Sequence, residues 1–336
     1  MLKVSQCFLF CFLGFLVPAT VSSYSPHLFP IRQAGQWGYI DRTGQIIVPP
    51  RFDQALEFSS GMAAVRIGKQ WGYIDSSGEL RIPLQFDALT VLPFCGTGVP
   101  VHDSSGILIF MNYTGTSIPT RRWEKVLDCF DGVMAVRENR KWGYISVDGT
   151  LLVRPEFQET AQFGDGLGSA KMDGKWGFVD RHGQWVIKPQ FEDAGRFSDG
   201  LAPVSQGGNW GYINREGQFV VKPAFSFAYP FSEGRGRVLA WGEDSIPRTG
   251  FVDRAGSIVI PPTYPVASDF ADSRSMVRIG DHFGFIDRNG QLVIPARYEW
   301  ATQFSGGLVL VKNFPQPDKP VEYYLDPDGK VIWTSE

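Results

Sequence analysis

A five-residue pattern, Trp-Gly-aromatic-aliphatic-Asp, recurs along the chain and constrains the fold more than any other feature. Its clearest copies begin at Trp37, Trp71, Trp142, Trp176 and Trp210. Weaker copies begin at Thr249, Phe283 and Glu322, and one degenerate copy begins at Leu108. Most of these starts lie 34 residues apart. A regular period of this size is typical of a tandem array, so chain length is no guide to domain number here.

Every copy carries a glycine seven residues after its start, from Gly44 in the first copy to Gly329 in the last. The residue three places before that glycine is Asp, Asn or Ser. Glycine adopts a positive φ without strain, and short polar side chains bond the backbone of a turn. The pattern therefore predicts a hairpin loop, plausibly a type I turn followed by a glycine bulge.

Short runs rich in β-branched and aromatic residues flank this loop, as in residues 37–41 and 45–48. A third run precedes the tryptophan, as in residues 62–67, and a proline usually follows the last run. Such runs are typical of strands, and proline ends strand pairing because it has no amide donor. Each copy is predicted to be a three-stranded antiparallel meander.

Six of the loops between meanders carry two aromatic residues six places apart, as in Phe157 and Phe163 or Phe191 and Phe197. One meander of 34 residues cannot bury so many rings, so neighbouring copies are expected to pack on each other. A period of 34 is also typical of tetratricopeptide helices. That alternative is disfavoured because interior glycines and prolines cost about 1 and 3 kcal/mol each in a helix.

The expected fold class is therefore all-β, a tandem array of about nine three-stranded antiparallel meanders. The array can form an open β-solenoid-like superhelix or close into a propeller-like ring. Nine copies exceed the usual blade number of propellers, and no strand near residues 27–33 or 331–333 is left over for exchange between the termini. The open superhelix is the preferred arrangement, with the closed ring as the alternative.

These motifs resemble the WG-repeat family of bacterial β-repeat proteins. Residues 141–145 (KWGYI) and 175–180 (KWGFVD) match its pattern almost letter for letter, and the resemblance runs from about Gln36 to the C-terminus. The resemblance implies a repeat architecture and a non-catalytic binding role, with no catalytic residues and no cofactor to carry over. The copies at Leu108, Thr249 and Glu322 depart from the pattern because they lack the tryptophan.

The N-terminus is typical of a secretory signal peptide. Lys3 precedes an apolar run over residues 8–17, and small residues follow at 18–23. The run is shorter than the roughly 20 residues that span a bilayer, so no stable membrane insertion is expected after cleavage. We expect a signal at 1–23 and a single repeat domain at 24–336, secreted, periplasmic or on the cell surface; an uncleaved anchor is the alternative.

No motif for metal, cofactor or catalytic chemistry stands out. His27, His102, His182 and His282 are far apart in the sequence, and the repeated aspartates fit turns better than calcium loops. A formal net charge of −3 argues against nucleic acid as a partner. An acid pair for glycoside cleavage would first be sought among Glu124, Asp128 and Asp131, near the degenerate copy.

Two sets of residues are candidates for special roles. The anchor tryptophans (Trp37, Trp71, Trp142, Trp176 and Trp210) are expected to form a buried structural ladder, whereas Trp123, Trp241 and Trp300 lie outside the pattern and are candidates for surface contact. Cys95 and Cys129 occupy corresponding segments of adjacent copies, which predicts a disulfide; a buried free pair is the alternative.

The sequence therefore favours an exported, non-catalytic repeat scaffold that binds a protein or a cell-envelope polysaccharide. The alternative is a carbohydrate-active enzyme with acids gathered in a groove of the array.

Overall fold

The computed structural model describes residues 27–87, 94–102, 108–118, 122–127, 129–316 and 319–335. Over these residues the chain is all-β, with 33 strands in nine small antiparallel sheets that follow one another along the chain. We call each sheet a blade. Nothing in this part of the chain is a helix with the length and apolarity needed to span a membrane. The expected signal segment, residues 1–23, lies outside the described residues.

The strands of each blade pair in the order in which they occur in the chain. Blades 1 to 3 contain β1 (Phe29–Gln33), β2 (Gln36–Ile40), β3 (Ile46–Phe52); β4 (Gln54–Ala55), β5 (Met62–Ile67), β6 (Gln70–Asp75), β7 (Leu80–Phe86); and β8 (Gly98–His102), β9 (Leu108–Asn112), β10 (Ser117–Ile118). Blades 4 to 6 contain β11 (Lys125–Val126), β12 (Val133–Glu138), β13 (Lys141–Ser146), β14 (Leu151–Phe157); β15 (Glu159–Gly164), β16 (Leu167–Met172), β17 (Lys175–Val179), β18 (Trp185–Phe191); and β19 (Asp193–Ala194), β20 (Ala202–Gln206), β21 (Asn209–Ile213), β22 (Phe219–Phe225). Blades 7 to 9 contain β23 (Phe227–Ser232), β24 (Arg235–Trp241), β25 (Pro247–Val252), β26 (Ile258–Tyr264); β27 (Ser275–Ile279), β28 (His282–Ile286), β29 (Leu292–Tyr298); and β30 (Trp300–Ala301), β31 (Val309–Gln316), β32 (Lys319–Leu325), β33 (Val331–Thr334).

The glycine seven residues after the start of each copy closes the predicted hairpin in every blade. In blade 1 the Gly44 amide donates to the carbonyl of Asp41 at 3.1 Å, and the Asp41 carboxylate accepts from the amides of Thr43 and Gln45. All nine glycines at this position have positive φ, between 75° and 87°. The loop predicted from the spacing of Asp and Gly is therefore confirmed, including its bulge.

These turn carboxylates make the stability of the fold depend on pH. The Thr43 hydroxyl donates to Asp41 and the Ser146 hydroxyl to Asp148, and these bonds hold the pKa of both carboxyls below their ordinary value of 3.8. Because the pKa of each carboxyl is lower in the folded than in the unfolded protein, the ionised carboxyl stabilises the fold above pH 3.8. This stabilisation is lost as the pH falls through the pKa of the folded state.

We therefore expect the urea concentration at the unfolding midpoint to decrease as the pH is lowered from about 5 to about 3, where these carboxyls take up protons. Asp41→Asn should keep the turn, since Asn112 and Asn214 occupy this position in other blades, and should have a flatter pH dependence. Parallel pH curves for the variant and the wild type would contradict this account.

The glycine of the Trp-Gly pair is required by a close approach of two backbones. In blade 5 the third strand, β17, has a bulge between Trp176 and Phe178, so that Gly177 lies against the backbone of the fourth strand, β18. A Cβ atom at Gly177 would be 2.5 Å from the carbonyl oxygen of Ile187. The same contact recurs at Gly38, Gly72, Gly143, Gly211, Gly250 and Gly284.

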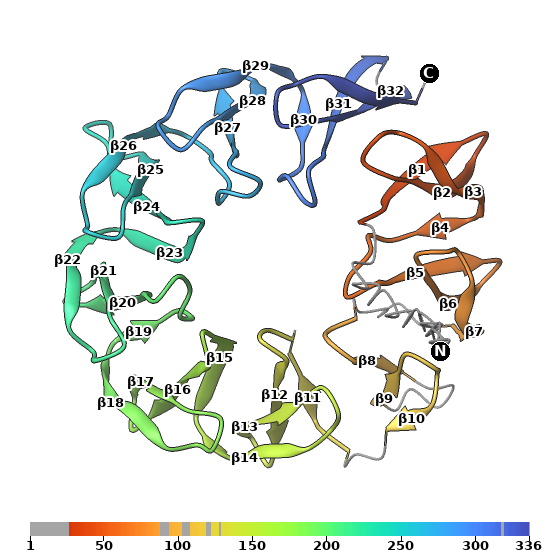
Figure 1. The fold of residues 1–336 in the computed structure, drawn as a ribbon. Helices are drawn as coiled ribbons and strands as arrows, with labels where there is room; N and C mark the ends of the chain where they lie inside the picture. The colour runs from red at the N-terminus through yellow and green to blue at the C-terminus, as the bar shows by residue number, and fades with distance from the viewer. Residues whose placement is uncertain are drawn as a thin grey trace, which may run out of the picture.

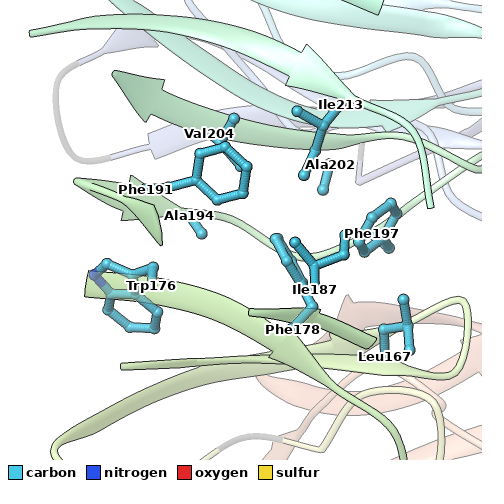
Figure 2. Close-up of a cluster of buried hydrophobic side chains, with 10 residues drawn as sticks. All are labelled: Leu167, Trp176, Phe178, Ile187, Phe191, Ala194, Phe197, Ala202, Val204 and Ile213. Atoms are coloured by element: carbon cyan, nitrogen blue, oxygen red, sulfur yellow. The ribbon is translucent and has the colours of Figure 1, made fainter. Parts of the chain in front are cut away.

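Adjacent blades pack face to face through buried apolar side chains. Figure 2 shows the joint between blades 5 and 6, where Phe178 and Ile187 of one blade meet Phe197, Ala202 and other residues of the next. Similar clusters lie between the other blades. The predicted stacking of copies is therefore how the chain buries its rings.

One aromatic pair recurs at these joints. The aromatic residue of the anchor contacts the second aromatic residue of the following loop edge to face, with ring centroids 4.6 to 5.2 Å apart. The pairs are Tyr39 with Phe58, Tyr73 with Phe94, Tyr144 with Phe163, Phe178 with Phe197, Tyr212 with Phe231, Phe251 with Phe270, and Phe285 with Phe304. Edge-to-face geometry is favoured by the ring quadrupoles.

The blades close into a ring, which corrects our preference for an open superhelix (Figure 1). Tyr324 of blade 9 contacts Phe29 of blade 1, and its hydroxyl donates to the carbonyl of Pro30 at 2.9 Å. Tyr144 of blade 4 makes the equivalent bond to Ser169 of blade 5, at 2.8 Å. Closure therefore needs no exchanged strand, because the last joint uses an ordinary contact between blades.

Candidate binding face

The meander topology gives the ring two different ends. At one end a short link joins the anchor strand to the strand before it, as Asp173–Gly174 joins β16 to β17 in blade 5; we call this end the link face. At the other end lie the Asp-x-x-Gly hairpins and the tight turns, such as Asp165–Gly166, that precede the strand before the anchor; we call it the turn face. The tight turns point toward the middle of the ring in Figure 1.

The turn face is occupied by a chain of hydrogen bonds from blade to blade. The carboxylate of Asp131 accepts from the amide of Gly166 in the next blade, at 2.9 Å, and Asp165 does the same for Gly200 at 2.7 Å. Arg181 donates to the carbonyl of Asp131 at 2.7 Å. These hydrogen bonds between blades were not predicted from the sequence. Two signals for them recur with the repeat, namely an Asp-Gly pair in the tight turn and an Arg directly after the first residue of the Asp-x-x-Gly hairpin.

The acids suspected of glycoside chemistry have backbone partners in the described residues. Asp131 belongs to the chain just described. Glu124 accepts from the amide of Asn139 at 2.8 Å and pairs with Arg137, so it holds the link of blade 4. Asp128 lies outside the described residues.

The histidines are scattered in the structure. His27 lies half-buried at the joint of blades 9 and 1, where burial lowers its pKa. His182 is exposed in a turn, His282 is exposed at the start of β28, and the side chain of His102 lies outside the description. Across the described ranges no three His, Cys, Asp or Glu side chains come together as a set of metal ligands.

Cys95 and Cys129 form a disulfide between blades 3 and 4, with their Cα atoms 5.9 Å apart. In blade 2 the equivalent of Cys95 is Ser59, whose hydroxyl donates to the carbonyl of Phe94 in the next blade, at 2.7 Å. Cys129 holds the position that a phenylalanine holds in most other joints. The disulfide therefore makes covalent a contact between blades that is polar elsewhere.

Removing this disulfide should lower the free energy of unfolding by roughly 3–4 kcal/mol, because it closes a loop of 34 residues. We expect the Cys95→Ser, Cys129→Ser protein to unfold at a lower urea concentration than the oxidised wild type. Reduced wild type should match the variant. Equal midpoints with and without reductant would contradict a bond between these two residues.

The anchor tryptophans lie at the link face, next to the links. Trp176 is buried, with 7% of its surface exposed, whereas Trp37, Trp71, Trp142 and Trp210 are only partly buried. A cation from the neighbouring strand lies over several of these rings: Arg66 over Trp71, Arg137 over Trp142 and Lys171 over Trp176, at 5.7 to 5.9 Å. One anchor is therefore buried and four are partly buried at the link face of blades 1, 2, 4, 5 and 6, where we expected a buried ladder.

The three tryptophans outside the anchors differ in exposure. Trp123 is partly buried and packs against the core of blade 4. Trp300 is exposed, but the ammonium of Lys312 covers its ring at 4.8 Å. Trp241 is 67% exposed, the largest exposure among the large apolar side chains of the described residues.

Trp241 lies on an elongated link in blade 7. Strands β24 and β25 extend to the pair Trp241 and Pro247, and a tight turn from Gly242 to Ile246 joins them. An ion pair of 2.7 Å between Asp244 and Arg248 braces this hairpin, whose tip also exposes 52% of Ile246. A braced hairpin that presents two bare apolar side chains is unusual unless something covers them.

Trp241 continues an aromatic row that begins in blade 6. Phe227 pairs with Leu239 across the sheet, and Trp241 is two residues further along the same strand, so all three point to one face. The ring of Phe227, 36% exposed, lies 4.6 Å from that of Trp210. We call Trp210, Phe227, Leu239 and Trp241 the aromatic patch.

Solved structures with detectable likeness differ greatly from this chain in detail. The tricorn protease has 11% sequence identity and a TM-score of 0.28, and the extracellular domain of the putative hybrid two-component system BT3049 from B. thetaiotaomicron has 10% and 0.27. The matches cover 91% and 92% of this chain, which spans 44% and 50% of those chains. No curated protein matches the sequence.

The WG containing repeat model matches the chain seven times, at residues 37–71, 71–94, 142–176, 176–210, 210–239, 250–281 and 283–313. The degenerate copy at Leu108 and the last copy at Glu322 lie outside these matches, yet both fold as blades. The matches cover well over half of the chain. This protein therefore belongs to the WG containing repeat family.

Proposed function

We propose that the protein is an exported, non-catalytic scaffold that binds a partner protein through the aromatic patch on its link face. The observation that carries the proposal is the braced hairpin of blade 7, which holds Trp241 67% exposed beside Phe227 and Trp210. Tryptophan is enriched among the residues that dominate binding energy at protein interfaces, and exposed apolar patches mark such sites.

The chemistry of the patch favours a protein over a glycan. Sugar sites combine a ring platform with polar groups that bond the hydroxyls. Arg248 of the hairpin pairs with Ala240, so it points to the opposite face of the sheet from Trp241. A binding role without catalysis is further supported by Glu124 and Asp131, which serve the backbone of the blades.

A site-specific photo-crosslinker at position 241 tests the proposal in the native envelope. Position 186 is the matched control, because Val186 is 49% exposed on the outer strand of blade 5, away from the patch. We expect one protein to be captured from position 241 and not from position 186. The purified partner should then bind Trp241→Ser at least tenfold more weakly than it binds Val186→Ser, a loss of about 1.4 kcal/mol or more.

Both serine variants should keep the melting temperature of the wild type, since neither side chain is in the core. If the wild-type protein binds envelope polysaccharide and Trp241→Ser abolishes this binding, the partner is a glycan and not a protein. Unchanged partner affinity in Trp241→Ser would refute the patch, and turnover of a substrate by the wild type would refute the non-catalytic role.

A further inference from the structure

The joint between blades 4 and 5 contains a cavity of about 330 Å³ that the proposed function does not use. It is lined from blade 4 by Val126, Leu127, Val133 and Ala135, and from blade 5 by Thr160, Ala161, Gln162 and Phe163. The volume falls within the range of small-molecule sites in proteins. None of these eight side chains carries a charge.

Small side chains at two repeat positions account for this space. Val133 stands nine residues before the anchor tryptophan, where blades 5 and 6 have Leu167 and Leu201. Ala135 stands where the next two blades have Ser169 and Pro203. At the following joint Leu167 packs in the core cluster with Phe197 (Figure 2).

Thr160 breaks the repeat in the opposite sense, because it places a hydroxyl where other blades have a buried alanine, such as Ala55 or Ala194. Its Oγ1 atom is buried and has no hydrogen-bond partner in the protein. The nearby Tyr144 hydroxyl donates its one proton to the carbonyls of Ala161 and Ser169, at 3.0 and 2.8 Å, so toward Thr160 it can act only as an acceptor. The buried Thr160 oxygen therefore lacks a hydrogen-bond donor, and a hydroxyl group on a ligand in the cavity would supply one.

We infer that this cavity is a binding site for a small, neutral, mainly apolar ring compound that carries one hydroxyl group. The aliphatic residues and Phe163 would contact the ring system. Thr160 would exchange a hydrogen bond with the ligand hydroxyl, and the amide of Gln162 is a second polar group in the lining. Because none of the lining side chains that the structure describes is charged, a neutral ligand is favoured.

Calorimetric titration with 2-naphthol, and with naphthalene as the analogue that lacks the hydroxyl, tests the inference on the whole protein. We expect 2-naphthol to bind about fivefold more tightly than naphthalene, the usual contribution of one hydrogen bond. Val133→Leu inserts the residue of the neighbouring blades into the cavity and should weaken both probes at least tenfold. Thr160→Val keeps the volume and should abolish only the preference for 2-naphthol.

The two variants test the site independently, so a failure of one to fold leaves the other informative. Thr160→Val should also be at least as stable as the wild type, because it removes an unpaired hydroxyl. Equal affinities of the wild type for the two probes, no detectable binding of 2-naphthol, or undiminished binding by Val133→Leu would overturn the proposal.

Discussion

Gly177→Ala is expected to lower the free energy of unfolding by about 4 kcal/mol, a large loss for a single substitution. The new Cβ would lie 2.5 Å from the Ile187 carbonyl oxygen and 2.7 Å from the backbone nitrogen of Pro189. Backbone atoms of a paired strand cannot move aside as a flexible side chain would, so the bulge must open. Equilibrium urea unfolding, followed by circular dichroism, measures the loss.

Gly174→Ala is the matched control in the same hairpin. Gly174 has a φ of +77°, but its Cβ would meet nothing within 4 Å. Only the backbone conformation opposes this change, at a cost of about 1 kcal/mol. Equal destabilisation by the two alanines would mean that the close approach of strands at Gly177 is not what selects glycine there.

Phe163→Ala is expected to cost about 4 kcal/mol, because it removes a ring that is 1% exposed from the joint between blades 4 and 5. The same change at Phe227, a ring that is 36% exposed on the link face, should cost much less. Thermal and urea unfolding of both variants give the comparison.

A double-mutant cycle then isolates the ring pair. Tyr144 and Phe163 are 4.6 Å apart at 87°, so their coupling should be about 1 kcal/mol beyond the separate losses. Additive losses for the Tyr144→Leu and Phe163→Leu changes would show that burial alone, and not the edge-to-face contact, stabilises the joint.

Local features of the fold could be predicted from single residues because each acts within its own repeat. Asp41 and Gly44 specify a turn by themselves. An aromatic residue six places after another, such as Phe58, indicates a buried ring. The pairing of Cys95 with Cys129 also depends only on adjacent copies. Such features need no knowledge of how far the array curves.

Ring closure could not be predicted in this way, because it depends on the sum of small rotations between nine blades. The absence of an exchanged strand suggested an open array, but the last joint uses Tyr324 as other joints use Tyr39 or Tyr144. Tyr324 lies in the copy at Glu322, which the repeat spacing identifies, but the spacing does not show that its ring meets the first copy. The aromatic patch was missed in part, because only the strand register shows that Phe227 and Trp241 lie on one face of the sheet.

The distance between blades 9 and 1 tests the ring most directly. Ile46, Leu80 and Val331 each begin the outer strand of a blade, in blades 1, 2 and 9, and are 42% to 47% exposed. Electron–electron double resonance between spin labels at 46 and 331 measures the joint that closes the ring, and labels at 46 and 80 measure an ordinary joint. A closed ring predicts the same short distance for both pairs, whereas a 46–331 distance several blades longer would contradict it.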